Sequence, residues 1–199
     1  MKFKYTVDWF EGKTEKLCEI MGHFDPRQEL HLLEIGSYEG RSTVWFIKNY
    51  LINKNSTITC IDPWMPYSQI DNKPVEFDLK GVYDTFIHNI KETGKDNQIL
   101  IKKSKSSYAL LDDDIRSKEY DMVFIDGNHS SHCVLQDAVY SWDLLKVNGI
   151  MIFDDYKWRI KISPPQSRPK IAVDGFVECY ANFLEKIHVG SRVAVRKIK

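Results

Sequence analysis

The chain has 199 residues, 43% of them hydrophobic and 13% aromatic, which suits one domain with a substantial core. Its 28 basic and 28 acidic residues balance, and this neutrality argues against a nucleic-acid partner. No apolar stretch approaches the ~20 residues that span a bilayer, and no signal peptide is evident, so we expect a cytoplasmic protein without membrane contact. Four widely spaced cysteines are expected to be reduced thiols: Cys18, Cys60, Cys133 and Cys179.

The first half of the chain predicts a helical segment and then strands alternating with helices. In order, we expect an amphipathic helix from Thr6 to Met21 within a helical segment 1–30, a strand over His31–Gly36, a helix from Arg41 to about Leu51, and a strand ending at Asp62. Residues 63–80 contain three prolines and no sustained period, which predicts a loop bordering a cleft. The amino-terminal helix could pack against a partner, so a homodimer is one candidate assembly, which the sequence does not decide.

The second half continues the alternation. We expect a helix over 81–94, a strand over 97–104, a short helix over 106–119, a strand over 120–127, a helix over 131–145, a strand over 149–156, a loop over 157–171, a helix over 172–187, and two strands within 188–198. Such alternation implies parallel βαβ units, and the continuous apolar runs fit a sheet covered on both faces. The whole chain, 1–199, is therefore expected to be one doubly wound α/β domain.

A glycine-containing loop follows the first strand. Gly36 and Gly40 allow a tight turn and a close backbone approach to a ligand, but the GxxxG spacing differs from the GxGxxG that holds a pyrophosphate. Glu34 can accept hydrogen bonds from a cationic amino acid, and Asp62 stands where an acid bonds a ribose diol. This combination predicts an adenosine-containing ligand without a pyrophosphate; the alternative is an ordinary strand–helix turn.

The segments ExGxxxGxS, IDGNH, LLKVNGIMIFDDY, PKIAVDGF and RVAVRK resemble the class I S-adenosylmethionine-dependent methyltransferases, in their small O-methyltransferase-like branch (the methyltransferase 24 type). The resemblance implies a Rossmann-like fold, with a mostly parallel seven-stranded sheet, an antiparallel carboxyl-terminal strand and helices on both faces. It also implies a set of residues that bind the cofactor S-adenosyl-L-methionine: Glu34, Gly36, Ser37, Gly40 and Ser42 around its methionine half, Asp62 at its ribose, Ser106 beside its adenine, and Asp126.

Carboxylates end two of the expected strands. Asp126 ends the fourth strand, and Asp154 and Asp155 end the fifth, so their side chains are expected to converge at one edge of the sheet. Clustered acids repel one another unless a cation neutralises them, and Mg²⁺ prefers such oxygen ligands. The sequence therefore predicts a metal site of Asp126, Asp154 and Asp155. A metal-free site, in which these acids form turns and caps, is the alternative.

The metal-dependent catechol-type and sugar O-methyltransferases are similar at this point, but the catechol-type enzymes carry a lysine base where this chain has His129. This departure from the family leaves the base open; His129 and Asp126 are the candidate catalytic residues, because a histidine suits proton abstraction near neutral pH, and a helix-capping or surface role for His129 is the alternative. His132 is a weaker alternative. Three aromatic residues in the bordering loops could stack on a planar substrate or simply pack within the loops: Trp64, Tyr67 and Trp158.

We therefore expect an enzyme that transfers a methyl group from S-adenosylmethionine to a hydroxyl of a small molecule, with sugars as one candidate class and Mg²⁺ as a candidate second cofactor. Two alternatives keep the fold: a nitrogen or nucleic-acid acceptor, and a cofactor-binding protein without turnover. A nicotinamide-dependent oxidoreductase is a third alternative, against which the missing GxGxxG counts.

Overall fold

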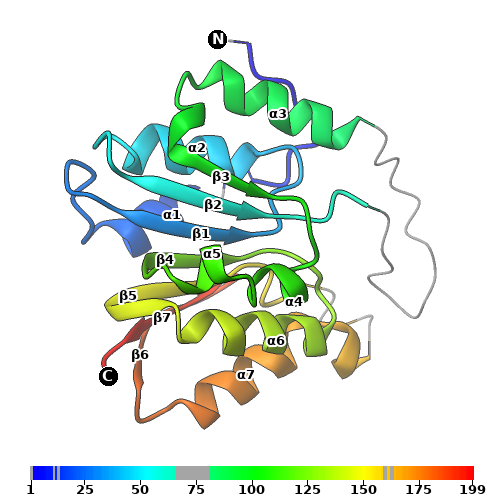
Figure 1. Ribbon diagram of the computed structural model, residues 1–199. Helices are drawn as coiled ribbons and strands as arrows, with labels where there is room; N and C mark the ends of the chain where they lie inside the picture. The colour runs from blue at the N-terminus through cyan, green and yellow to red at the C-terminus, as the bar shows by residue number, and fades with distance from the viewer. Residues whose placement is uncertain (1, 11, 13, 66–80, 159–160, 162–163) are drawn as a thin grey trace.

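The computed structural model describes residues 2–10, 12, 14–65, 81–158, 161 and 164–199. Its strands are β1 (His31–Ile35), β2 (Thr57–Ile61), β3 (Ile99–Lys102), β4 (Tyr120–Ile125), β5 (Leu145–Phe153), β6 (Leu184–Val189) and β7 (Val193–Lys197). They form one sheet in the order β3-β2-β1-β4-β5-β7-β6 (Figure 1). Strands β1 to β5 pair in parallel, whereas β7 is antiparallel to both of its neighbours. The expected mostly parallel sheet with an antiparallel carboxyl-terminal strand is confirmed.

The helices cover both faces of the sheet. They are α1 (Thr14–Met21), α2 (Arg41–Tyr50), α3 (Val82–Glu92), α4 (Ser106–Ala109), α5 (Asp113–Arg116), α6 (Ser131–Trp142) and α7 (Pro169–Cys179), with 3₁₀ turns η1 (Asp96–Gln98) and η2 (Pro165–Ser167). Figure 1 shows α4 to α7 in front of the sheet and α1 to α3 on the other side. None of the helices in these described ranges is long and apolar enough to cross a membrane.

The sequence of each central strand divides its side chains between the two layers. In β4, Phe124 packs with α1 to α3, whereas Ile125 packs with α4 to α7; in β5, Ile152 and Phe153 divide in the same way. Successive side chains of a strand point to opposite faces, so a continuous apolar run supplies both cores. This is why these strands lack a polar–apolar alternation.

The amino-terminal prediction was partly wrong, because the helix begins at Thr14 and not at Thr6. The preceding residues run along α3 and the glycine loop, where side chains bond their backbone. Asn89 of α3 accepts a hydrogen bond from the Lys4 amide (2.8 Å) and donates one to the Lys4 carbonyl (2.7 Å). The carboxylate of Glu39 accepts bonds from the amide and hydroxyl of Thr6 (2.8 and 2.7 Å). These bonds satisfy backbone groups that a helix would otherwise pair internally.

The carboxyl-terminal helix also differs from the prediction. It spans Pro169–Cys179 and not 172–187, since residues from Leu184 onward pair with β7 as strand β6. The expected helix over 106–119 is two short ones, α4 and α5. The expected loop over 157–171 contains η2 and the start of α7 among its described residues. Most of the expected loop 63–80 lies outside the described residues.

Replacing Phe176 should test the apolar core between the sheet and helices α4 to α7. This fully buried side chain of α7 packs against Trp142, Phe153 and Tyr180. Phe176→Ala should lower the free energy of unfolding by about 3–5 kcal/mol, measured by urea denaturation, because it leaves a large cavity. Phe183→Ala, at a side chain that is 47% exposed, is the control and should change it by less than about 1 kcal/mol. Equal effects would contradict the packing described here.

Candidate active site

The candidate site lies at the carboxyl edge of the parallel strands, where hydrogen bonds continue past the strand ends. The Gly36 amide donates to Ile61 (2.8 Å), and the Asp126 amide donates to Ile35 (2.8 Å). In the same way the Asp154 amide donates to Ile125 (3.0 Å). These bonds fix the backbone of the residues after β1, β4 and β5 side by side at one edge of the sheet.

Gly36 brings the loop after β1 against the loop after β4. Its φ is +91°, and a Cβ atom at this position would lie 2.2 Å from the Asp126 carbonyl oxygen and 2.6 Å from the Gly127 Cα. Both obstacles are backbone atoms, so no side chain fits here. A Cβ atom at Gly40 would likewise lie 2.9 Å from the ring of Phe86. The two glycines therefore serve the packing of the loop itself.

Glu34 lies beneath this loop and is fully buried. Its carboxyl group accepts hydrogen bonds from the hydroxyls of Ser37 (2.8 Å), Ser42 (2.5 Å) and Thr43. Burial raises the pKa of Glu34, while the three hydroxyls lower it. Glu34, Ser37 and Ser42 thus brace the loop from inside. Their expected contact with the methionine half of a cofactor stays a prediction.

Asp62 closes the other side of the loop. One carboxylate oxygen accepts hydrogen bonds from the amides of Ser37 (3.1 Å) and Tyr38 (3.0 Å), and the other accepts from the amide of Trp64 (2.7 Å). Burial raises the pKa of Asp62, and these backbone bonds counteract it. Asp62 therefore stands beside the glycine loop as the sequence indicated. In this structure it orders the backbone that a ligand would meet.

Three potential metal ligands come together near this loop. Single donor atoms of Asp126, His129 and Asp155 all lie within 4.8 Å of one another. The Nε2 of His129 lies 3.1 Å from an oxygen of Asp155 and 4.0 Å from an oxygen of Asp126. The three side chains are 14–28% exposed, so they are partly buried yet open to a ligand. Two carboxylates and an imidazole form a donor set that divalent cations accept.

The structure does not bring Asp154 into this group. Its two oxygens accept hydrogen bonds from the Nε and Nη2 of Arg192, each at 2.9 Å, and both side chains are almost fully buried. A carboxylate held in this way by a guanidinium fork faces its partner and not the cleft. His129 takes the third place in the group. The sequence could not reveal this exchange, because Arg192 follows 38 residues later.

His129 is held on two sides. Its ring stacks on Trp158, with 4.6 Å between centroids and 17° between planes, and its Nε2 bonds Asp155. Its buried Nδ1 has no hydrogen-bond partner among the described residues. His132 is exposed in the first turn of α6, with its Nε2 3.3 Å from the Cys133 sulfur, and takes no part in the group.

The aromatic loop residues have different surroundings. Trp64 is buried; its indole N–H donates to the Tyr38 carbonyl (2.7 Å), and its ring packs on Tyr83 and Phe86. Trp64 therefore packs within the protein, which was the alternative to stacking on a substrate. Trp158 is half-buried and stacks on His129; its contact with a substrate stays a prediction. Tyr67 lies outside the described residues. All four cysteines are free thiols, as expected.

Sequence reasoning missed Asp137 of α6. Its side chain is buried, its Oδ1 has no partner among the described residues, and its Oδ2 lies 3.8 Å from where a Cβ on Gly127 would be. Burial raises the pKa of Asp137 to about 7, and a hydrogen bond with Ser106 opposes this shift. Ser106, at the start of α4, thus contacts Asp137; its expected place beside the adenine of the cofactor stays a prediction. No pattern in the sequence around Asp137 indicates that its carboxyl group is buried.

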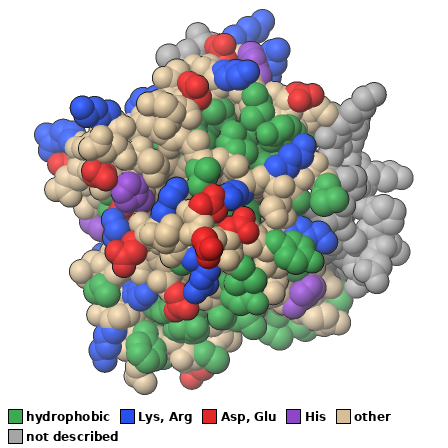
Figure 2. Space-filling view, viewed as in Figure 1, with side chains coloured by type: hydrophobic (Ala, Val, Ile, Leu, Met, Phe, Trp, Pro, Cys, Tyr) green, Lys and Arg blue, Asp and Glu red, His purple; other side chains and the backbone are tan. Residues whose placement is uncertain are grey.

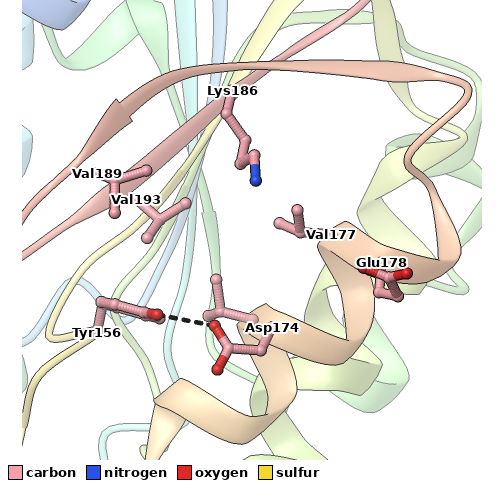
Figure 3. Close-up of a pocket in the computed structure, with 8 residues that line it drawn as sticks. Tyr156, Asp174, Val177, Glu178, Lys186, Val189 and Val193 are labelled. Carbon is pink, nitrogen blue, oxygen red and sulfur yellow. Dashed lines mark hydrogen bonds between the residues drawn. The ribbon is translucent and has the colours of Figure 1, made fainter.

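A separate pocket of about 270 Å³ lies between α7 and the β6–β7 hairpin (Figure 3). Val173, Val177 and Val193 contribute apolar lining. At one end the Tyr156 hydroxyl donates to Asp174 (2.7 Å), and Lys170 donates to the Tyr156 oxygen (2.6 Å). The pocket matters for the site because Tyr156 follows Asp155 directly and is anchored here.

Comparison with known proteins identifies the family. Residues 33–156, more than half of the chain, match the model of a family described as a methyltransferase domain. The chain belongs to this family. It is thus an S-adenosylmethionine-dependent methyltransferase, as the resemblance implied.

Individual relatives are more distant. An uncharacterized protein of Acanthamoeba polyphaga mimivirus is 26% identical over 173 residues, which are 82% of this chain and 71% of that protein. An O-methyltransferase from Bacillus cereus in complex with SAH has a TM-score of 0.64 and 18% identity, covering 96% of this chain and 82% of that one. The MycE methyltransferase of the mycinamycin pathway, in complex with Mg and SAH, has a TM-score of 0.64 and 17% identity, covering 97% and 51%. At these identities the structural likeness establishes the fold.

The raised pKa of Asp137 predicts a dependence of stability on pH. A folded-state pKa of about 7, above the ordinary 3.8, means that the folded chain keeps a proton that the unfolded chain has lost. The resulting stability is present below pH 3.8 and is lost as the pH rises toward 7. Asp137→Asn, neutral throughout, should therefore gain stability relative to wild type by up to about 4 kcal/mol between these limits.

Urea denaturation of both proteins from pH 4 to pH 8 measures this difference. Asp143→Asn, at an exposed position just after α6, is the control and should show no such trend. A constant difference between Asp137→Asn and wild type across the range would show that the carboxyl group of Asp137 is already ionised at low pH.

Proposed function

We propose that this protein transfers the methyl group of S-adenosylmethionine to a hydroxyl oxygen of a small molecule, with sugars as one candidate class and a divalent cation such as Mg²⁺ assisting. The observation that carries the proposal is the group Asp126–His129–Asp155, which lies directly beside the glycine loop. A proton acceptor or cation site is thereby adjacent to the loop that the family uses for its cofactor. We further propose that residues 1–199 form one methyltransferase domain.

The cofactor residues are proposed from the fit of this chain's side chains. Asp62 offers carboxylate oxygens at the end of β2, where a ribose diol would donate to them. Asp137 carries a buried acceptor without a partner among the described residues, beside Ser106. A ligand amino group, such as that of adenine, would satisfy it, because a buried acceptor gains from any donor that reaches it. The SAH bound in the Bacillus cereus structure supports the same ligand class.

Deprotonation of the acceptor hydroxyl has two routes through the same three residues. In the first, His129 accepts the proton; the Asp155 carboxylate orients the ring through Nε2 and stabilises the cation that results. In the second, Asp126, His129 and Asp155 hold a divalent cation, which when bound lowers the pKa of a substrate hydroxyl and orients it. The magnesium present in the MycE structure supports the second route.

The charge distribution favours a small acceptor over a nucleic acid. On the face shown in Figure 2, acidic and basic side chains are interspersed. Among the ion pairs, Lys102 bonds both Asp112 and Asp114. A nucleic-acid acceptor would call for a continuous basic surface. This view and the balanced total charge both support a small-molecule acceptor.

Cofactor binding is the first test. Asp62→Ala should weaken the binding of SAH or S-adenosylmethionine by about 10–100-fold in calorimetry, because it removes charged acceptors of ribose hydrogen bonds. Asp96→Ala, at an exposed acid in η1, is the control and should bind as wild type does. If wild type bound neither compound, the proposed function would fail.

Metal dependence is the second test. Asp126→Asn and Asp155→Asn should each lower the affinity for Mn²⁺, used in place of Mg²⁺ and followed by electron paramagnetic resonance, by at least ~10-fold. Asp143→Asn is the matched control. His129→Gln separates the two routes: loss of Mn²⁺ binding assigns His129 to the cation, whereas loss of turnover with Mn²⁺ binding intact assigns it to the proton.

An acceptor screen, with formation of SAH as the readout, distinguishes the remaining alternatives. Turnover with hydroxyl compounds, sugars first, is the expected result. Turnover only with amines, or salt-dependent binding to RNA, would replace the acceptor class. Tight cofactor binding without turnover on any acceptor would favour a binding protein with this fold.

A further inference from the structure

Arg192 occupies an unusual place for a charged residue. It lies in the turn between β6 and β7, yet it is only 2% exposed. Its guanidinium carbon lies 5.7 Å from the ring centroid of Phe10 and 6.0 Å from that of Phe124. The guanidinium reaches Asp154 with two hydrogen bonds of 2.9 Å. A buried ion pair adds little to stability, since desolvation offsets the attraction, so stability alone does not account for its burial.

The partner of Arg192 controls the backbone of the next residue. The Oδ1 of Asp154, which accepts from Arg192, also accepts the amide of Asp155 at 2.8 Å. Asp155 has a φ of +52°, in the left-handed region that residues with a side chain rarely adopt. Such a conformation persists only where its surroundings impose it. The bond from the Asp155 amide to Asp154 is one such constraint, and Arg192 fixes the acceptor.

The conformation of Asp155 in turn sets the position of His129. The Asp155 carboxylate bonds the His129 Nε2 at 3.1 Å, and the Asp155 carbonyl accepts the amide of Trp158 at 2.7 Å. Trp158 is the residue on which His129 stacks. Both contacts that hold the imidazole therefore start from Asp155, one from its side chain and one from its backbone.

From these contacts we propose that Arg192 is a positioning residue, which sets the geometry of Asp155 and His129 through Asp154. On the far side of Asp155, Tyr156 is anchored by Asp174 (Figure 3) and also by Lys170. Residues 154–156 are thus held at both ends: Arg192 binds the buried Asp154 at one end, and Asp174 binds Tyr156 at the other. The use made of this geometry in methyl transfer rests on the proposed function, but the positioning itself does not.

Nuclear magnetic resonance of the histidine rings tests the positioning without a metal or a substrate. The His129 signal, identified by its absence in His129→Gln, reports on the ring's place against Trp158. Arg192→Met should move this signal, while the signal of His31, at the start of β1, stays in place. Arg192→Lys keeps the charge without the two-pronged geometry and should move the signal less. Arg196→Met, at a partly exposed arginine of β7, is the matched control and should leave it unchanged.

A double variant separates positioning from folding. Asp154→Leu with Arg192→Met replaces the buried pair by apolar side chains, so the thermal midpoint should return toward that of wild type. The His129 signal should nevertheless stay displaced, and Mn²⁺ affinity should be reduced by about 10–100-fold. A well-folded double variant with its His129 signal at the wild-type position would overturn the proposal.

The proposed function can fail separately. If wild type bound neither Mn²⁺ nor SAH, the methyl-transfer proposal would be lost, and the His129 signal would still decide the role of Arg192. If wild type bound both and the double variant did so equally with an unmoved signal, only the role of Arg192 would be lost.

Discussion

The backbone of Gly36 lies against the backbone of Asp126, and the rest of the candidate site depends on this contact. With no room for a Cβ atom between the two loops, the turn after β1 and the turn after β4 form one continuous surface. Neighbouring parallel strands place such turns at the same edge, but a side chain would separate them. Glu34 from below and Asp62 from the side then hold the glycine loop in this position. The glycine loop and the group around His129 are thus a single unit.

Three buried carboxyl groups near this unit meet the cost of burial in different ways. Glu34 collects hydroxyl donors, Asp154 has a guanidinium, and Asp137 keeps an unpaired oxygen among the described residues, with a pKa of about 7. The carboxyl oxygens of Glu34 and Asp154 all accept hydrogen bonds, so these two residues form a frame for the loops. The third group, Asp137, is incompletely bonded among the described residues, and such a buried group is what a bound ligand can satisfy. Their hydrogen bonds therefore distinguish Glu34 and Asp154, which hold the frame, from Asp137, which we propose meets a ligand.

Local patterns were sufficient for the sheet and for the edge at which the site lies. The apolar runs and the acids that end them predicted β1, β2, β4 and β5 and placed Asp62 and Asp126 correctly at strand ends. They failed where a distant partner decides. In the sequence Asp154 is indistinguishable from its neighbour Asp155, and only the bond to the distant Arg192 separates their roles. The end of α7 was misplaced because Leu184–Ile187 fits both a helical and a strand pattern, and pairing with β7 decides for the strand. The amino-terminal helix was overextended because Asn89 and Glu39, far along the chain, bond its backbone.

The extended amino-terminal segment also has a consequence for the order of folding during synthesis. The partner of Lys4 on α3 is Asn89, which is made 85 residues later. At ordinary rates of translation the segment waits roughly 4–17 seconds for that partner, with its backbone groups bonded to water. Contacts between residues so far apart form late, because the intervening chain must first be brought together. The glycine loop, whose Glu39 carbonyl also bonds Asn89, therefore reaches its final form only after α3 has left the ribosome.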